Sequence, residues 1–375
     1  NKTQRNQIHV NFGCARFVWN QMLNMHIERY KNNKKAKFQG RYSMDVLLKA
    51  LKIEYPWLKQ AESTSLQRVN RDLDDAFQRF FNPDLQNGFP RFKSKKNTNQ
   101  SYTSKFVNNN IRIVDEHHIK LPKLGLVYFK AGRILNGKIR AVTVRVNSRK
   151  QYQASILVES ENQTFKKTKK SVGIDLGLKS LTVTSDGQKE DILKVDDRLN
   201  KQLRIWERKK SRRYENAKKA MAFDEHDKVL FPRTDLKQFP RYQQAVRTVA
   251  KLKKHIAERR RDNLHKLTTR LVKDYDTIVV ENLSVKNMMK NHHLSASIAN
   301  ASWGTLISQL KYKCAWYGKR LIIIDPKNTS RICHECKQKD HEFDSLSQSE
   351  WLAAREWDCP NCHAHLDRDV NAAKN

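Results

Sequence analysis

Long apolar runs are absent from this sequence of 375 residues. The longest are strand-sized, such as Leu321 to Ile324, whereas a helix needs about 20 consecutive apolar residues to span a bilayer. The sequence opens with Asn1-Lys2-Thr3-Gln4-Arg5 and shows no apolar core of a secretory signal there. A membrane protein is therefore not expected, and a cytoplasmic location is.

Acidic residues are few relative to basic ones. The chain carries 39 Asp and Glu against 74 Lys and Arg, which gives a net charge of +35. Such an excess repels itself unless a polyanion neutralises it, and neutralised phosphates release counterions. Nucleic acid is the favoured partner. A ribosomal-type structural protein and a membrane-surface binder are the alternatives, and the second is disfavoured because no basic amphipathic segment dominates.

Cysteine is also scarce, with six residues in the chain. Four of them form two C-x-x-C pairs, Cys333 with Cys336 and Cys359 with Cys362, separated by 22 residues. In a reducing compartment such cysteines are more often metal ligands than disulfides. The spacing is typical of a four-thiolate structural zinc ribbon, and redox-active pairs are the poorer alternative.

Three histidines lie near these cysteines and could be taken for ligands: His334, His363 and His365. Four thiolates already complete a tetrahedral zinc site, so we predict that the histidines are not ligands. The two remaining cysteines, Cys14 and Cys314, stand alone in apolar-leaning segments. We predict that both are buried thiols.

The apolar periodicity changes twice along the chain. It follows 3.6 residues in the first third, as in the helix predicted for Ser65 to Phe81, and a period of two between about 88 and 160, as at Val142, Val144 and Val146. A lysine-rich linker is expected over 161–170. Strands then alternate with long helices, which predicts an α/β domain. Its expected elements are strands at Val172–Asp175, Ser180–Thr184, Thr277–Val280 and Arg320–Ile324, helices at about 196–219, 242–273 and 303–317, and a loop over 220–238.

Two carboxylates end apolar strands in this last region. Asp175 follows Val172-Gly173-Ile174, and Glu281 follows Thr277 to Val280. Burying two acids side by side is costly unless a cation lies between them, and clustered carboxylates suit Mg²⁺. Two such ions, about 4 Å apart, promote phosphodiester hydrolysis. The alternative, that each acid caps a neighbouring helix or turn, stays open.

A third acid comes from the segment after the second C-x-x-C pair. Asp367 and Asp369 lie two residues apart, so on an extended segment both share one face. Asp369 is closer to the helix-forming Asn371-Ala372-Ala373 and could serve as an N-terminal helix charge. The residues alone do not decide between the two acids.

Dense basic runs are a further feature of the long helices. Arg208 to Arg213 and Arg259 to Arg261 are dense enough to follow a phosphate backbone, although any one cation could simply be a solvated side chain. Aromatic residues interleave with them, for example Trp206 and Tyr214. Stacking on bases is one function for these rings, and core packing is the expected one for Trp206.

Taken in order, these motifs resemble one known family. Each motif is modest alone, but the ordered set resembles the RuvC-type nuclease core of TnpB, a transposon-encoded RNA-guided nuclease related to the type V CRISPR effectors. The nuclease motifs are Val172-Gly173-Ile174-Asp175-Leu176-Gly177, Val280-Glu281-Asn282-Leu283, Thr329-Ser330-x-x-Cys333-x-x-Cys336 and Asp367-Arg368-Asp369-Val370-Asn371-Ala372-Ala373. Phe12 to Asn20 and Gly88 to Lys95 resemble the family's N-terminal half.

The resemblance implies an α/β multidomain fold. Its parts would be an α-helical recognition lobe (1–87), a β-barrel wedge domain (88–168), an RNase H-like RuvC core (169–324), an inserted zinc ribbon (325–366) and the final acidic segment of the core (367–375). The family's first wedge strand has no counterpart before Asn1.

The resemblance also implies the chemistry and the partners. The catalytic trio would be Asp175, Glu281 and Asp369, holding two Mg²⁺ ions, with one structural Zn²⁺ on the four cysteines. A monomer in the bacterial cytosol would use a guide RNA from the transposon end to cut both strands of DNA beside a short transposon-adjacent motif. The alternatives are a catalytically inactive RNA-guided DNA-binding protein, a strand-transfer transposase, and a CRISPR effector of the same lineage.

Overall fold

A computed structural model describes residues 1–375 except 86, 98, 133, 148–150, 163, 192–196, 221–235, 237, 292–294, 327–328 and 340–353. The loop expected over 220–238 therefore lies largely outside the described residues. The chain forms two compact units, Asn1–Glu161 and Asn162–Asn375. The division falls in the stretch predicted to be a linker. Among the described residues, no helix is long and apolar enough to cross a membrane.

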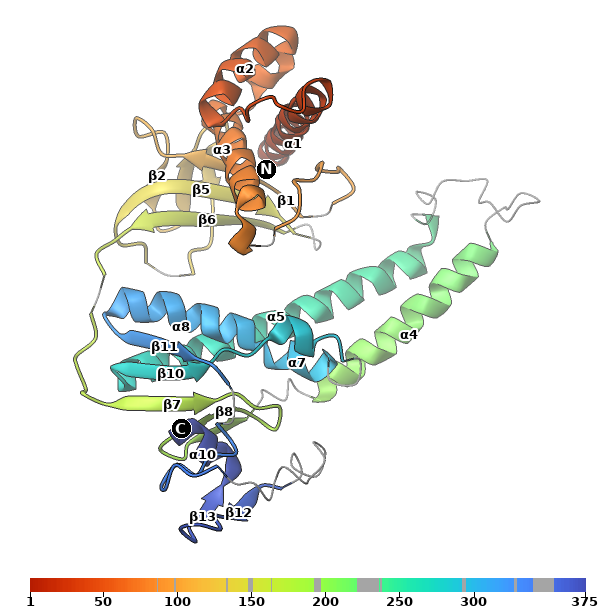
Figure 1. Cartoon of the computed structure of the whole chain (residues 1–375). Coiled ribbons are helices and arrows are strands. Elements are labelled where there is room, and N and C mark those ends of the chain that lie inside the picture. Colours follow the sequence, from red (N-terminus) through yellow and green to blue (C-terminus); the bar gives the residue numbers. More distant parts are fainter. Residues whose placement is uncertain are drawn as a thin grey trace. The chain divides into compact units, whose positions relative to one another are not determined.

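Three helices build the first part of the first unit (Figure 1). They are α1 (Lys2–Asn32), α2 (Arg41–Glu54) and α3 (Ser63–Phe81), with short 3-10 turns at η1 (Pro56–Gln60) and η2 (Pro83–Leu85). The carboxylate of Glu62 accepts hydrogen bonds from the N–H groups of Thr64 and Ser65 and so caps the start of α3. The predicted apolar stripe of α3 is confirmed, because Leu66, Val69, Leu73 and Phe77 are buried.

Six antiparallel strands complete the first unit. One sheet contains β1 (Gln100–Lys105), β5 (Lys138–Val146) and β6 (Tyr152–Glu159), and the other contains β2 (Arg112–Asp115), β3 (His118–Leu121) and β4 (Gly125–Tyr128). The predicted alternation is confirmed in β5, where Val142, Val144 and Val146 are buried. Helices and strands share one hydrophobic core. Pairing among the described strands gives two sheets, and closure into a barrel stays a prediction.

A five-stranded mixed sheet organises the second unit. The strands are β7 (Ser171–Asp175), β8 (Ser180–Thr184), β9 (Lys189–Asp191), β10 (Thr277–Glu281) and β11 (Arg320–Ile324), in the order β11-β10-β7-β8-β9. Strands β7, β10 and β11 are parallel, whereas β8 and β9 are added antiparallel through hairpin pairing. The hairpin signal at Asp186-Gly187 is confirmed, since Gly187 has a φ of +84° in the turn.

The helices of this unit lie on both faces of the sheet. They are α4 (Asp197–Lys219), α5 (Pro240–Asp274), α6 (Val285–Met288), α7 (Ser295–Ala301), α8 (Trp303–Tyr317) and α10 (Arg368–Lys374). Leu271 of α5 and Leu310 of α8 share a buried core with Val172, Ile174 and Val280 of the strands. The short helix α10 packs on β7 and β8 (Figure 1).

A basic helical hairpin extends from the sheet. Helices α4 and α5 run antiparallel, with Glu207 paired to Lys253 and Arg213 donating to the carbonyl of Arg241. Trp206 lies under the cationic groups of Lys209 and Arg213. The dense cations predicted on these helices therefore lie along two helices that pack against each other.

Candidate active site and metal centre

The two strand-end carboxylates lie at the same edge of the sheet. In the parallel pairing of β7 with β10, Ile174 is opposite Val280. Asp175 and Glu281 each follow one residue later, so both end neighbouring strands at their carboxyl ends, where ligands of α/β sheets bind. Because side chains alternate along a strand, these two acids lie on the face opposite the buried Ile174 and Val280.

Gly173 determines how the third acid reaches this edge. It lies on the same face of β7 as Asp175, and a Cβ atom at its position would be 1.8 Å from the carbonyl oxygen of Ala373 in α10. Only glycine allows this close approach. Since α10 begins at Arg368, its contact with β7 brings Asp369 toward Asp175.

The pKa of Asp175 shows that the other two acids lie close enough to act on it. Burial, followed by the negative charges of Glu281 and Asp369, raises the pKa of Asp175 to about 7. The guanidinium of Arg368 and the backbone N–H of Leu176 act in the opposite direction. The three acids named from the sequence thus share one electrostatic environment, although none is adjacent to another in the chain.

Glu281 is the most enclosed of the three acids, with 8% of its surface exposed. Burial raises its pKa, and the hydroxyl of Thr329, which donates to Oε1, lowers it. Among the described residues, the next helix after Glu281, α6, has no side-chain cap, which argues against the capping alternative for this acid. The hydrogen bond from Thr329 instead orients its carboxylate.

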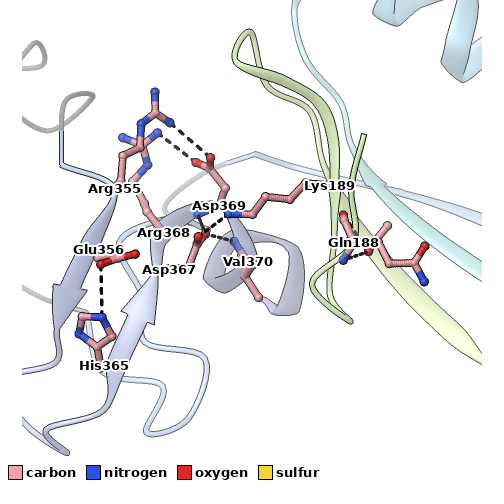
Figure 2. Close-up of polar contacts among 10 residues, drawn as sticks. Gln188, Lys189, Arg355, Glu356, His365, Asp367, Arg368, Asp369 and Val370 are labelled. Atoms are coloured by element: carbon pink, nitrogen blue, oxygen red, sulfur yellow. Dashed lines mark hydrogen bonds and ion pairs between the residues drawn. The ribbon is translucent and has the colours of Figure 1, made fainter. Parts of the chain in front are cut away.

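Asp367 has a different function from Asp369. Its Oδ1 accepts hydrogen bonds from the N–H groups of Asp369 and Val370, each at 3.0 Å, so it is the N-cap of α10. Its Oδ2 pairs with Lys189 of β9 at 2.5 Å (Figure 2). Burial opposes ionisation, but these bonds hold the pKa of Asp367 below its usual range. Its oxygens are thereby engaged in joining α10 to β9.

Two guanidinium groups contact the carboxylate of Asp369. Figure 2 shows Arg355 and Arg368 both directed at it, with Arg355 Nη1 3.3 Å from Oδ2 and Arg368 Nη2 3.1 Å from Oδ1. Arg368 is buried and also donates to the carbonyl of Ala354. The carboxylate of Asp369 is therefore held by two guanidinium groups at the start of α10.

The three carboxylates are less tightly grouped than the cysteines. Within the described part of the chain, only the four cysteines bring three or more metal-ligating atoms within 4.8 Å of one another. A cavity of about 220 Å³ opens beside Glu281 and Gly173, between the open face of the sheet and α10.

The four predicted zinc ligands come together as expected. Their Sγ atoms lie within 4.8 Å of one another, with 3.7 Å between Cys333 and Cys362 and 3.6 Å between Cys336 and Cys359. Zinc–sulfur bonds of about 2.3 Å in a tetrahedron require sulfur atoms about 3.8 Å apart. Strands β12 (Glu356–Asp358) and β13 (His365–Asp367) support the site. The donor set and its spacing fit one zinc ion.

The nearby histidines form other contacts. His334 Nδ1 lies 3.0 Å from Asn371 Oδ1, and His365 Nδ1 lies 2.8 Å from Asp358 Oδ1. Hydrogen bonding and the charge of Asp358 raise the pKa of His365. Among the described residues the cluster contains cysteines alone, which fits the prediction that the histidines are not ligands. Cys14 and Cys314 are buried, as predicted.

Several residues that shape the site had no assigned function in the sequence. They are Gly173, Lys189, Thr329, Arg355 and Arg368. A glycine inside an apolar strand is a signal of close backbone approach, so Gly173 was detectable. The other four are polar residues, and each contacts a partner between 14 and 178 residues away in the sequence. Arg368 in addition contacts its neighbour Asp369. No local pattern marks contacts of that kind.

Comparison with protein families covers most of the chain. Residues 303–375 match the family described as "Cas12f1-like, TNB domain" and residues 155–292 match "Probable transposase". Residues 1–35 match "Helix-turn-helix domain", although in this structure most of them form a single helix, α1.

Relatives and a solved structure extend this similarity over nearly the whole length. A "Putative RNA-guided DNA endonuclease" of Streptomyces pristinaespiralis is 32% identical over 374 residues, which cover 97% of this chain and 83% of the relative. The "Putative RNA-guided DNA endonuclease InsQ" of Escherichia coli (strain K12) is 30% identical over 380 residues, covering 97% and 86%. The "Cryo-EM structure of the Cas12f1-sgRNA-target DNA complex" contains a chain with the same fold, at a TM-score of 0.54 and 12% identity, covering 99% of this chain and 82% of that one. The chain therefore belongs to the TnpB family, which its ordered motifs resemble.

Proposed function

We propose that this chain is an RNA-guided endonuclease that cuts double-stranded DNA by metal-dependent hydrolysis. Two relatives that share 30% and 32% of their residues with it bear names for that activity. The observation that carries the proposal is the convergence of Asp175, Glu281 and Asp369, because the charges of the other two acids add to burial in raising the pKa of Asp175. An enzyme retains such an unfavourable group of acids when a cation is to occupy it.

The sheet of the second unit supports an RNase H-like RuvC core. An antiparallel meander of β7, β8 and β9 continues into parallel β10 and β11, with α5 and α8 on one face and α10 on the other. In this proposal the core comprises 169–324 and 367–375, and the zinc ribbon, 325–366, is inserted between them. Residues 1–87 form the recognition lobe and residues 88–168 form the wedge.

The trio would hold two Mg²⁺ ions. Bound there, the ions would activate a water molecule and stabilise the leaving oxygen of the phosphodiester. The chain's own residues prepare this site: Thr329 orients Glu281, Gly173 allows α10 to approach β7, and Arg368 fixes Asp369. Burial and the neighbouring acids raise the pKa of Asp175 in the absence of metal, so binding of cations would favour loss of its proton.

The proposed partners are a guide RNA from the transposon end and a DNA target beside a transposon-adjacent motif. The net charge of +35 and the basic hairpin of α4 and α5 suit phosphate backbones. Pairing between guide and target would supply the sequence specificity, as in RNA-guided systems generally. One nuclease site in a monomer, acting in the bacterial cytosol, would cut both strands in turn.

The proposal is tested with the protein purified together with its RNA. A plasmid that carries a sequence matching this RNA is incubated with the complex and Mg²⁺. We expect Asp175→Ala, Glu281→Ala and Asp369→Ala each to slow cleavage by at least about 1,000-fold, because each removes an anionic metal ligand worth several kcal/mol. The matched control is Asp191→Ala at the exposed end of β9, which should cleave normally. Undiminished cleavage by the Asp175 variant would refute the assignment.

A strand-transfer reaction is the second candidate, because residues 155–292 match a family described as "Probable transposase". Such reactions also use three carboxylates on a sheet of this kind. Joined DNA products rather than broken ends in the same assay would establish it. An uncut plasmid with every divalent metal, despite normal RNA binding, would instead identify a catalytically inactive binding protein.

A further inference from the structure

A groove lined by aromatic rings lies in the first unit, where the ends of α1 and α3 meet. Its volume is about 720 Å³, which is within the range of ligand sites. We call it the aromatic groove. Its rings belong to Tyr30, Phe38, Phe77, Phe80, Phe81 and Phe89. All of them belong to the first unit, whereas the three acids of the nuclease site belong to the second.

The rings are packed against one another in a fixed arrangement. Phe77 is 3% exposed and stacks on Phe81, with centroids 5.9 Å apart and planes 23° apart. Phe80 meets Phe89 edge to face at 5.3 Å, and Phe38 stacks on the ring of His26 at 4.9 Å. Interlocked rings of this kind form a rigid surface that orders few side chains when a ligand arrives.

Four of these rings remain open to solvent. The exposed fraction is 59% for Tyr30, 52% for Phe81, 46% for Phe89 and 37% for Phe80. Single exposed apolar residues are ordinary, but a contiguous group marks a binding surface. Beneath them, the Nε2 atom of His26 is buried and has no hydrogen-bond partner among the described residues. The groove therefore has unused capacity for both apolar and polar contacts.

The charge around the groove limits what can occupy it. Arg29, Lys31 and Lys37 line it, and none of the described lining residues is acidic. The nearby carboxylate of Glu28 is already paired with Lys31 at 3.0 Å. A second copy of this chain would bring a net charge of +35 to a cationic rim. A ligand that combines flat apolar rings with negative charge is complementary, and nucleotides have both properties.

We infer that the aromatic groove binds an unpaired nucleotide of the guide RNA. Its base stacks on the exposed phenyl rings of Phe80 and Phe81, and its phosphate faces Arg29 and Lys37. Guide RNA is the source because proteins recognise RNA through unstacked bases in loops and ends, whereas duplex DNA offers no free base before it is opened. The inference depends on the proposed function, since it requires that the chain carry a guide RNA.

The test measures binding of the RNA that co-purifies with the protein to purified, RNA-stripped variants over a series of salt concentrations. Stacking contributes about 1–3 kcal/mol per base, so Phe81→Ala should weaken binding by about 5- to 150-fold. Removing a ring leaves the phosphate contacts in place, so the salt dependence should not change. By contrast, Lys37→Ala should lower the slope of log affinity against log salt by about one, the change expected for one phosphate that is no longer neutralised.

The matched control is Tyr42→Ala, which removes an exposed ring from α2, outside the groove. It should bind as the unmodified protein does. Because Phe81 is half exposed, its variant should stay folded at the assay temperature, which circular dichroism checks. Unchanged RNA affinity in Phe80→Ala and Phe81→Ala would overturn the inference. So would a dimer that these changes dissociate, since the groove would then bind a second copy. If the unmodified protein binds no RNA, the proposed function itself fails.

Discussion

Replacing Gly173 with alanine tests whether the contact between α10 and β7 positions the proposed catalytic acids. A Cβ at Gly173 would lie 1.8 Å from the carbonyl oxygen of Ala373, and real Cβ atoms do not approach closer than 3.0 Å. The two backbones must therefore separate by at least 1.2 Å, the difference between these distances. Because Asp369 lies in the first turn of α10, its carboxylate moves away from Asp175 with the helix.

The size of this displacement determines how much the cleavage rate should fall. A shift of about 1 Å in a catalytic group costs on the order of 100-fold in rate, so we expect Gly173→Ala to cleave guide-matched DNA about 100-fold more slowly. Overpacking of this contact should also cost about 1–3 kcal/mol of stability. The change lies in the second unit at the nuclease sheet, so binding of guide RNA and content of zinc should stay near those of the unmodified protein.

The assay compares single-turnover cleavage rates at a temperature well below the unfolding midpoints. Gly304→Ala is the control, because Gly304 lies in α8 and a Cβ there meets no atom within 4 Å. It should cleave at the normal rate. If Gly173→Ala is folded, binds RNA and also cleaves normally, then α10 does not need this close contact and the account of how Asp369 is positioned is wrong.

Three further predictions concern stability and zinc content. Since the folded protein holds the pKa of Asp175 near 7, against an ordinary value of 3.8, metal-free protein should lose up to about 4 kcal/mol from this group as pH rises from 4 to 8, and Asp175→Asn should reduce the pH dependence in thermal melts. Cys362→Ser should reduce bound zinc from about one ion per chain toward none by elemental analysis, and full occupancy would contradict the four-thiolate site. Lys319, whose side chain is 1% exposed, pairs with Asp276, so Lys319→Met should lower the free energy of unfolding in denaturant melts, whereas Lys266→Met at an exposed ion pair should hardly change it.

The sequence predicted the sheet of the second unit well because its signals are local. The strand Arg320–Ile324 and the helix Trp303–Tyr317 have the predicted bounds. The first is a short β-branched run, and the second ends at Gly318, whose φ of +68° terminates the helix. The four cysteines were also predictable, because their spacing alone encodes the geometry of the ligand set.

The order of strands and the choice of the third acid were not available from local patterns. Asp367 and Asp369 differ only through partners elsewhere in the fold, namely Lys189 for the first and Arg355 for the second. Family resemblance, and not spacing, favoured Asp369. The structure adds a physical reason: the charge of Asp369 acts on Asp175, whereas Asp367 caps α10 and pairs with Lys189.

The pairing of the β strands in the first unit was also not predictable from local patterns. Alternation along Val142, Val144 and Val146 predicts that a strand is half buried, but it does not say which strands pair. Among the described residues the pairing produces two three-stranded sheets that share a core with the helices. The aromatic groove was likewise not foreseen, because its rings come from separate segments of α1, α3 and the residues between and after them.

The most direct test of the central claim is to locate bound metal ions. Crystals of the protein with its guide RNA, soaked in Mn²⁺, give anomalous peaks at every bound ion. We predict two peaks about 4 Å apart, in contact with the carboxylates of Asp175, Glu281 and Asp369. Peaks elsewhere, or none at these three acids at full Mn²⁺ concentration, would contradict a metal-dependent nuclease at this edge of the sheet.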